Sequence, residues 1–231
     1  MSETAHLALL FDAPMQSWGV SSKFQNRGTL PHPTRSAILG LFCAAAGAAK
    51  GSREEKELLE ALAGARITTV EIPRRAADGE RRVPIRRLRD FHTVLGTRTA
   101  DGKPNANAVV TLRDYLTDAR FGVVVSGPNE LVTRLQRWLE DPVWGVWFGR
   151  KCCLPAAPIV RGVFGSREEA LLHLTEGREI RLFTRVEDVD RFDEGTDSLC
   201  DVPLSFGTPD SSSEGRVFAY RRIRVSPAEA E

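Results

Sequence analysis

The chain has 231 residues, of which 42% are hydrophobic and 27% charged, with a formal net charge of +1. This length is enough for one large or two small domains with a proper core, and the composition is ordinary for a soluble globular protein. No apolar run approaches the roughly 20 residues of a membrane-spanning helix, and the N-terminus does not resemble a secretory signal, so we expect a cytoplasmic protein.

Charge is strongly segregated along the chain. Residues 74–103 contain nine cations and four acids, a net charge of +5, whereas residues 187–214 contain nine acids and one cation, a net charge of −8. Such a protein can bind a polyanion on one face while it presents another to a protein partner. Two solvated loops of accidental charge would have the same composition, so the sequence leaves both interpretations open.

The cysteine and histidine spacings do not indicate a metal site. Cys152 and Cys153 are adjacent, unlike the separated pairs of zinc sites, and Cys43 lies in a segment patterned for burial. The fourth cysteine is Cys200, and the four histidines are far apart in the sequence. We therefore expect buried, reduced thiols and no metal or other cofactor.

An apolar run at residues 7–11, short enough for one buried strand, leads into a loop and then a helix. Thr34 is suited to cap this helix, and four apolar side chains fall on one of its faces: Ile38, Leu41, Phe42 and Ala45. The loop carries an aromatic, an amide and two cations, which suits a partner that bears phosphates and bases. The alternative is that Met15 and Trp18 only seal the end of the core.

The next segment predicts a second helix, a strand and a hairpin. A capping box at residues 52–55 opens the helix, and residues 66–72 are rich in β-branched side chains. Turn signals at 78–79 and 101–105 punctuate the basic stretch, so residues 83–94 and 109–116 can pair as an extended hairpin. Because like charges repel, we expect this arginine-rich arm to become ordered against a polyanion.

A glycine-containing loop follows the next strand, at 121–125, and the next helix, at 129–139. It reads Trp144-Gly145-Val146-Trp147-Phe148-Gly149-Arg150-Lys151. The glycines allow a sharp turn or the close approach of a ligand, and two cations follow at once. The spacing differs from that of a P-loop, so we infer no nucleotide hydrolysis. A turn with aromatics packed beneath it is the alternative.

Residues 159–164, 179–185 and 216–225 are predicted strands, and a capping box at 166–169 opens a helix that ends near residue 174. The acidic segment between the last two strands is predicted to be a loop that is partly disordered. The order strand, helix, strand, hairpin, strand, helix, strand indicates an α+β protein. Its core would be ferredoxin-like (RRM-like), β-α-β-β-α-β, with an inserted arginine-rich hairpin.

We place a ferredoxin-like RNA-binding domain at residues 1–151, with the hairpin at about 78–116. A smaller C-terminal β-rich portion with the acidic loop takes up residues 152–231.

RNA binding is the function that these features favour. Trp18 offers a stacking plane for a base. Seven cations are candidates for phosphate contacts: Lys23, Arg27, Arg35, Arg89, Arg98, Arg150 and Lys151. His92 could hydrogen-bond a phosphate in the same surface. A ferredoxin-like sheet with such side chains most often binds single-stranded RNA.

His92 is also the best catalytic candidate, as a general acid or base in metal-independent RNA cleavage through the 2′-hydroxyl. A cleavage site needs a second group at a defined geometry, and none is visible in the sequence, so we favour a histidine that binds phosphate or packs in the hairpin. An endoribonuclease and a generic single-stranded RNA-binding module remain as alternatives.

Four motifs, in the same order, resemble the CasD family of subunits of the type I-E CRISPR Cascade, within the RAMP superfamily. The first joins Leu10-Phe11-Asp12-Ala13-Pro14-Met15-Gln16-Ser17-Trp18-Gly19 to Pro33-Thr34-Arg35-Ser36-Ala37-Ile38-Leu39-Gly40-Leu41. The others are Asp90-Phe91-His92-Thr93-Val94-Leu95-Gly96, Arg113-Asp114-Tyr115-Leu116-Thr117-Asp118-Ala119 and Phe148-Gly149-Arg150-Lys151-Cys152-Cys153-Leu154-Pro155. The resemblance covers residues 7–164.

This resemblance implies a non-catalytic subunit that binds the 5′ handle of the CRISPR RNA in an antiviral surveillance complex. Its expected partners are the backbone subunit CasC, the large subunit CasA and, through the complex, target DNA. The hairpin is similar to the family's thumb. A related branch in type I-C systems cuts precursor RNA with an adjacent Lys-His pair, whereas His92 is flanked by Phe91 and Thr93.

Overall fold

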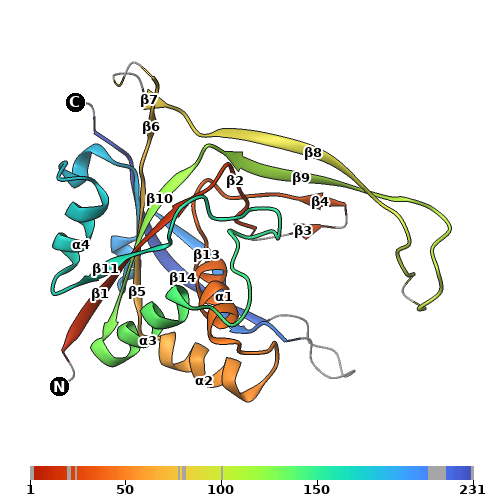
Figure 1. Ribbon diagram of the computed structural model, residues 1–231, viewed down its shortest axis with the longest axis horizontal. Helices are drawn as coiled ribbons and strands as arrows, with labels where there is room; N and C mark the ends of the chain where they lie inside the picture. The colour runs from red at the N-terminus through yellow and green to blue at the C-terminus, as the bar shows by residue number, and fades with distance from the viewer. Residues whose placement is uncertain are drawn as a thin grey trace.

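The structure is a computed structural model that describes residues 3–19, 22–23, 25–77, 79, 82–99, 101–207 and 217–229, with only the backbone described at 22–23. Figure 1 shows a body of sheet and helices from which a long two-stranded hairpin projects. Parts of the basic and acidic segments, at residues 78, 80–81 and 208–216, lie outside the described residues. Of the helices in the described part of the chain, none has the length and apolar character needed to span a membrane.

The body is organised around one seven-stranded antiparallel sheet. Its order is β11-β1-β10-β5-β12-β14-β13. The strands are β1 (Thr4–Asp12), β5 (Arg66–Glu71), β10 (Arg120–Pro128), β11 (Val160–Phe164), β12 (Arg185–Asp188), β13 (Asp197–Ser205) and β14 (Val217–Ser226). The chain is therefore of the α+β class.

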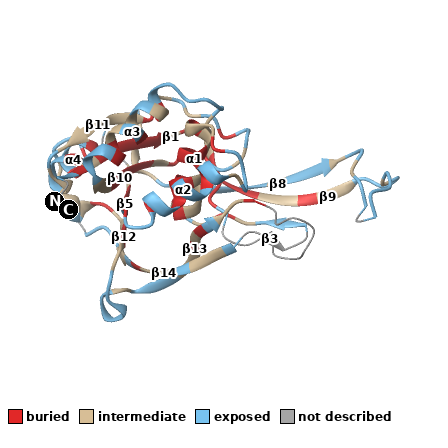
Figure 2. Cartoon of the chain, turned by 90° about the horizontal axis from the view of Figure 1, so that it is seen from below, coloured by how far each residue is buried: buried red, intermediate tan, exposed pale blue. Residues whose placement is uncertain are grey.

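Helices cover both faces of this sheet (Figure 2). Helices α1 (Arg35–Ala46), α2 (Arg53–Leu62) and α3 (Asn129–Glu140) pack on one face, and α4 (Arg167–Leu174) packs on the other. In β1, Leu7 and Leu9 join the core beneath the first three helices, whereas Ala8 and Leu10 join the core beneath α4. The run at residues 7–11 is continuously apolar because both faces of its strand are covered.

The helix starts follow the capping chemistry that the sequence predicts. The Thr34 hydroxyl accepts a hydrogen bond from the Ala37 amide at 3.2 Å, and the Ser52 hydroxyl accepts one from the Glu55 amide at 3.2 Å. The four side chains of the apolar stripe in α1 are all buried. The stripe is what fastens α1 to the sheet, because helical stability in proteins comes mainly from such packing.

A second, smaller sheet carries the projecting hairpin. Strands β8 (Arg86–Val94) and β9 (Val109–Thr117) pair antiparallel over their full length. The other edge of β9 pairs with β2 (Met15–Gln16) and β4 (Asn26–Arg27), and β4 pairs with β3 (Ser22–Lys23). The hairpin begins at Arg86 rather than near residue 78, because β6 (Arg74–Arg75) and β7 (Arg82–Val83) form a separate two-stranded ribbon.

The C-terminal segment differs from the sequence prediction in three ways. The strand predicted at residues 179–185 begins only at Arg185, as β12: a 3-10 helix (Ile180–Leu182) precedes it, and a second one (Phe192–Glu194) follows it. The acidic segment contains β13 instead of being only a loop. The expected domain boundary after residue 151 does not separate two bodies, because β11 to β14 extend the same sheet as β1.

The prediction of buried thiols is correct only in part. Cys43 and Cys153 are buried, Cys200 is half-buried, and Cys152 is exposed.

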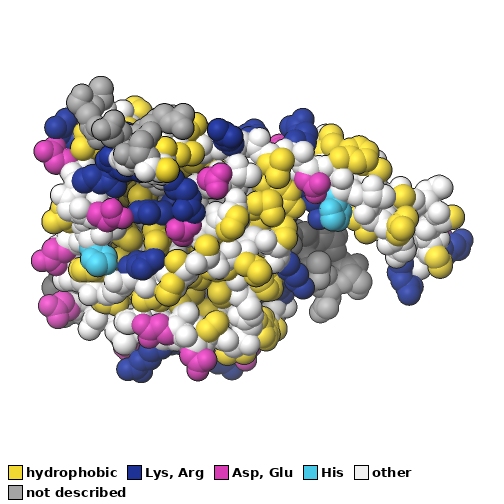
Figure 3. Space-filling view, turned by 45° about the horizontal axis from the view of Figure 1, so that its top comes forward, with side chains coloured by type: hydrophobic (Ala, Val, Ile, Leu, Met, Phe, Trp, Pro, Cys, Tyr) yellow, Lys and Arg dark blue, Asp and Glu magenta, His cyan; other side chains and the backbone are white. Residues whose placement is uncertain are grey.

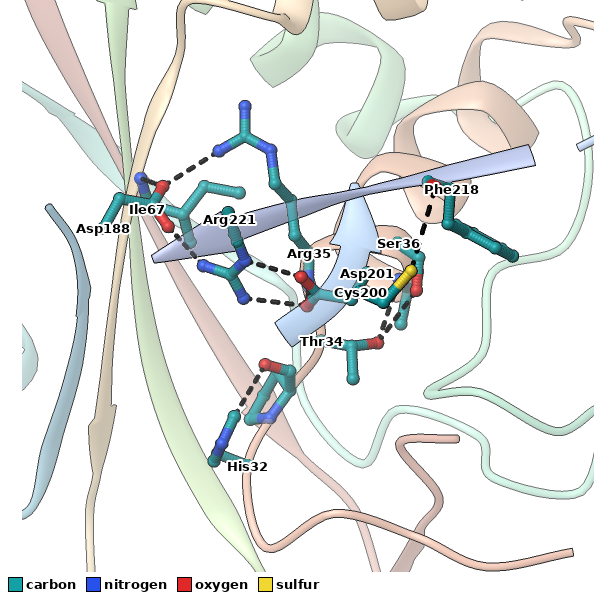
Figure 4. Close-up of polar contacts among 12 residues, drawn as sticks. His32, Thr34, Arg35, Ser36, Ile67, Asp188, Cys200, Asp201, Phe218 and Arg221 are labelled. Atoms are coloured by element: carbon teal, nitrogen blue, oxygen red, sulfur yellow. Dashed lines mark hydrogen bonds and ion pairs between the residues drawn. The ribbon is translucent and has the colours of Figure 1, made fainter. Parts of the chain in front are cut away.

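A buried ion cluster explains why an acidic sequence can enter the sheet (Figure 4). Arg221 of β14 pairs with Asp201 of β13, with N···O distances of 2.6 and 2.8 Å, and also with Asp188 of β12. Arg35 donates to Asp188 at 2.9 Å, and its backbone N–H donates to Asp201 at 2.7 Å. The Ile67 amide also donates to Asp188, at 2.9 Å. Asp188 thus accepts from three groups and Asp201 from two, which offsets the cost of removing these carboxylates from water.

The prediction that Arg35 binds a phosphate is therefore wrong for this structure. Its side chain is only 5% exposed, and it also donates to the carbonyl oxygen of Leu62 at 2.9 Å, which ties the start of α1 to the end of α2.

Replacing Arg221 with methionine should lower the free energy of unfolding by about 3–5 kcal/mol, because it leaves buried carboxylates without their main partner. Arg224→Met is the matched control on the same strand. Its side chain is 46% exposed and lies 3.4 Å from Glu187, so the loss should be about 1 kcal/mol or less. Urea unfolding of the three proteins measures both values. Equal losses would contradict a special role for the buried cluster.

Candidate nucleic-acid interface

Residues 13–19 are held against both the core and the hairpin. The Gln16 side-chain amide donates to the carbonyl oxygens of Phe11 and Ala119 at 2.9 and 2.8 Å. The Ser17 amide donates to the Phe148 carbonyl at 3.0 Å, which joins this segment to the glycine-containing loop. The base of the hairpin, the N-terminal loop and the glycine-containing loop therefore form one unit.

Gly149 makes the contact between these two loops possible. Its φ is +96°, and a Cβ atom at this position would lie 1.8 Å from the Ser17 carbonyl oxygen. No side chain fits in that space, so the close approach of the two backbones requires glycine here.

Arg150 lies at the junction of the three segments. Its guanidinium donates to the backbone carbonyls of Asp114 in β9 and Arg27 in β4, at 2.9 and 2.8 Å. It also lies 4.4 Å from the centre of the Tyr115 ring, in a cation–π geometry. Much of the hydrogen-bonding capacity of Arg150 is thus used to hold the site together.

A cavity of about 740 Å³ opens beside this junction, between α1, the glycine-containing loop and the ends of β13 and β14. Four aromatic side chains line it: Trp144, Trp147, Phe206 and Phe218. Its cationic lining residues are Arg27, Lys50 and Arg150, and its polar ones include Ser17, Thr34, Ser36 and Glu55. Aromatic surfaces together with nearby cations are what a base and its phosphates require.

The hairpin supplies a second group of predicted site residues. Arg89 makes a bidentate pair with Asp114 at 2.8 and 3.2 Å through Nε and Nη2, and its Nη1 takes no part in this pair. These hydrogen bonds lower the pKa of the Asp114 carboxyl, against the opposing effect of its burial. The Arg89 side chain remains 64% exposed.

His92 and Arg98 lie farther along the hairpin. His92 is 3.5 Å from Asp90 on the same strand, and Arg98 donates to the Gly102 carbonyl at 3.2 Å. Figure 3 shows basic and apolar side chains distributed along the projecting hairpin. Its exposed apolar residues include Leu88, Phe91 and Leu95.

The structure brings together only some of the predicted residues. Arg27 and Arg150 line the cavity, and Lys151 lies beside it, 5.6 Å from the centre of the Trp147 ring. Arg89, His92 and Arg98 lie on the hairpin instead, and Arg89 and His92 project from opposite faces of β8 because they are an odd number of residues apart. The side chain of Lys23 lies outside the described residues.

The prediction that Trp18 stacks on a base is wrong for this structure. Trp18 is 1% exposed and packs in the core, with its ring centre 5.7 Å from that of Phe11 and 6.0 Å from that of Phe148. No ring face is open to a base, so the alternative interpretation, a tryptophan that seals the core, is the one that fits the structure. The aromatic surfaces near the site come from Trp144 and Trp147 instead.

The sequence carried a partial signal for these aromatics. Trp144 and Trp147 flank a glycine beside the predicted cations, where the sequence left open a turn with aromatics packed beneath it, and Trp144 is 44% exposed. Lys50, Phe206 and Phe218 come from distant segments, so nothing local marks them, and Glu55 is marked only as part of the capping box at 52–55. Among the described residues, no three His, Cys, Asp or Glu side chains form a group that could hold a metal ion.

Comparison with known proteins agrees with this architecture. The model of the CRISPR-associated protein (Cas5) family matches residues 6–224. The CRISPR system Cascade subunit CasD of Escherichia coli (strain K12) is 32% identical over 162 residues, which is 68% of this chain and 70% of the relative. The chain belongs to the Cas5 family.

Solved structures resemble this Cas5 chain along most of its length. A chain from a CRISPR RNA-guided surveillance complex is 30% identical and superimposes with a TM-score of 0.71, over 97% of this chain and 90% of the other. A crystal structure of a Cas protein is 24% identical, with a TM-score of 0.60 over 96% and 95% of the two chains, and supports the fold.

Replacing Gly149 with alanine should separate the glycine-containing loop from Ser17 and destabilise the Cas5 fold by about 3 kcal/mol, because backbone cannot yield as a flexible side chain can. Gly28→Ala is the control. Gly28 lines the same cavity, but an added Cβ meets nothing within 4 Å. Chemical denaturation compares the two variants, and thiol titration reports whether the buried Cys153 becomes reactive. Unchanged stability in Gly149→Ala would contradict the contact.

Proposed function

We propose that this Cas5-family chain is a non-catalytic subunit of a CRISPR RNA-guided surveillance complex and binds the 5′ handle of the CRISPR RNA. The names of two similar proteins support the assembly: a Cascade subunit, and a chain of a surveillance complex. Both relatives align with most of this chain, so the proposal concerns the whole body and not one motif.

The observation that carries RNA binding is the position of the aromatic cavity at the base of a basic hairpin. Arg150 contacts β9 at Asp114, and the hairpin residue Arg89 pairs with the side chain of the same aspartate. A single strand of RNA that entered the cavity with its bases could therefore continue along the hairpin with its phosphates. Such a path combines stacking with charge neutralisation.

The roles of the cations follow from their hydrogen bonds. Arg150 is a positioning residue that fixes the site, with at most part of its guanidinium turned to RNA. Arg27, Lys151 and the Nη1 edge of Arg89 are the proposed phosphate contacts in the described part of the chain. Arg98, between β8 and β9, and His92, on the face of β8 opposite to Arg89, are further candidates.

The element order supports a finer assignment of the fold. Strands β1, β5, β10 and β11 occur in the sheet order β11-β1-β10-β5, with helices after the first and third of them in the chain. This is the arrangement of a β-α-β-β-α-β, ferredoxin-like unit, and the β8–β9 hairpin inserted between its second and third strands is the proposed thumb.

We further propose the partners that family resemblance suggests. The hairpin would lie over RNA beside the backbone subunit CasC, and another surface would meet the large subunit CasA. Target DNA would be bound through the complex, in the cytoplasm.

Replacing Arg89 with alanine should weaken binding of a 5′-handle RNA and reduce the slope of log affinity against log salt by about 0.7, the value of one lost phosphate contact on a single strand. Arg181→Ala is a control, since Arg181 pairs with Glu179 and Glu229 and lies in the 3-10 helix near α4. Fluorescence anisotropy at several salt concentrations measures both slopes. Equal slopes for Arg89→Ala and the parent protein would contradict a phosphate contact.

Precursor CRISPR RNA incubated with the purified protein, without metal, should remain intact, because in the described part of the chain the ion-pair partner of His92 is Asp90 on the same strand, and a cleavage site needs a second acid or base at a defined geometry. Gel analysis of end-labelled RNA tests this. Specific cleavage that is lost in His92→Ala would overturn the non-catalytic assignment in favour of an endoribonuclease. Equal affinity for handle and scrambled RNA would favour a generic RNA-binding module.

A further inference from the structure

An exposed tyrosine lies on the C-terminal strands, next to the aromatic cavity. Tyr220 of β14 is 77% exposed, and its side chain makes no hydrogen bond, ion pair or ring contact with another described residue. A single exposed apolar side chain is common on protein surfaces and has no assigned role by itself. The residues that surround Tyr220 therefore decide what its ring can bind.

The neighbours of Tyr220 on the same face of the sheet line the cavity. Tyr220 pairs with Cys200 of β13, so the two side chains project from one face, with Cβ atoms about 5 Å apart. Phe218 is two residues away on β14 and projects from that face as well, about 7 Å along the strand. Cys200 and Phe218 both line the cavity, and the Cys200 thiol donates to the Phe218 carbonyl oxygen at 3.8 Å (Figure 4). Tyr220 thus continues the cavity wall on its solvent side.

Charges of opposite sign lie on the two sides of Tyr220. On the cavity side, Arg27 and Lys50 are lining residues. In the other direction along β14, the next residue of this face is Arg222, which holds residues 192–195 against the strand through two of their carbonyl oxygens. That segment carries two exposed acids. A phosphate backbone would be attracted to the cavity side and repelled beyond Arg222, so its contact with this face would end at Tyr220.

We propose that Tyr220 is a stacking platform for the nucleotide that follows the one in the aromatic cavity, on the same single strand of RNA. Proteins that bind single strands commonly place successive bases on separate aromatic side chains. Every base has a π-face, so this platform adds affinity without a preference for one base. The inference rests on the proposed function and adds to it a binding residue from the C-terminal strands.

Replacing Tyr220 with leucine should weaken binding of an end-labelled oligoadenosine about tenfold, because one base loses its stacking partner. Tyr220→Phe keeps the ring, and its affinity should stay within about twofold of the parent value. The slope of log affinity against log salt should be the same in all three proteins, because no cation is lost. Fluorescence anisotropy of the full-length chain at several salt concentrations measures both quantities.

Two controls separate stacking from other effects. Phe192→Leu removes an aromatic ring that is 76% exposed but lies next to the acids beyond Arg222, so it should leave the affinity unchanged. An abasic oligomer of the same length keeps the phosphates and lacks the bases. Tyr220→Leu and the parent protein should bind this oligomer equally, whereas a general disturbance of the fold would weaken both kinds of binding.

A second measurement uses the parent protein alone. Oligo(4-thiouridine) irradiated in complex with the protein should crosslink to Tyr220, and trypsin would place this crosslink in the peptide 217–221. Parent-like affinity for oligoadenosine in Tyr220→Leu, or crosslinks only outside 217–221, would overturn the platform while leaving RNA binding intact. A parent protein that bound none of these base-bearing oligomers would overturn the proposed function as well.

Discussion

The whole body depends on a buried cluster of four charges that joins α1 to the C-terminal strands. Asp188 and Asp201 can lie in β12 and β13 because Arg35 and Arg221 meet them there. The same cluster extends the sheet beyond β5 and brings the ends of β13 and β14 to α1 and α2. Without these ion pairs, the burial of Asp188 and Asp201 would cost free energy that nothing offsets, and one wall of the aromatic cavity would be missing.

A second constraint fixes the opposite wall. Gly149 lets the glycine-containing loop touch Ser17, and Arg150 then reaches carbonyl oxygens of both β4 and β9. Two small sets of contacts therefore form the aromatic cavity from segments that are about 200 residues apart in the sequence. One set consists of buried ion pairs, and the other consists of contacts to backbone carbonyl oxygens. Strand β9 belongs both to the hairpin and to this second wall, so the base of the hairpin has a fixed position beside the aromatic cavity.

This arrangement separates two tasks that RNA binding requires. The cavity offers aromatic rings, which suit bases, whereas the hairpin offers exposed guanidinium groups, which suit phosphates. Opposite charges within the hairpin, such as Asp114 beside Arg89, reduce the repulsion that an arginine-rich ribbon would otherwise suffer. The position of these groups supports the proposed RNA partner, and family membership supports the proposed assembly.

The sequence by itself determined the local elements whose signals are short-range. Examples are the buried run at residues 7–11, the caps at Thr34 and Ser52, and the motifs that identify the family. Only the tertiary structure decided the environment of each charged or aromatic side chain. Arg35 and Trp18 look like ligands in the sequence, yet both are buried, because partners more than 100 residues away, Asp188 and Phe148, complete their surroundings. Glu55 looks like a simple cap in the sequence, and only the approach of the end of β13 brings the Ser205 hydroxyl and the Phe206 amide to its carboxylate.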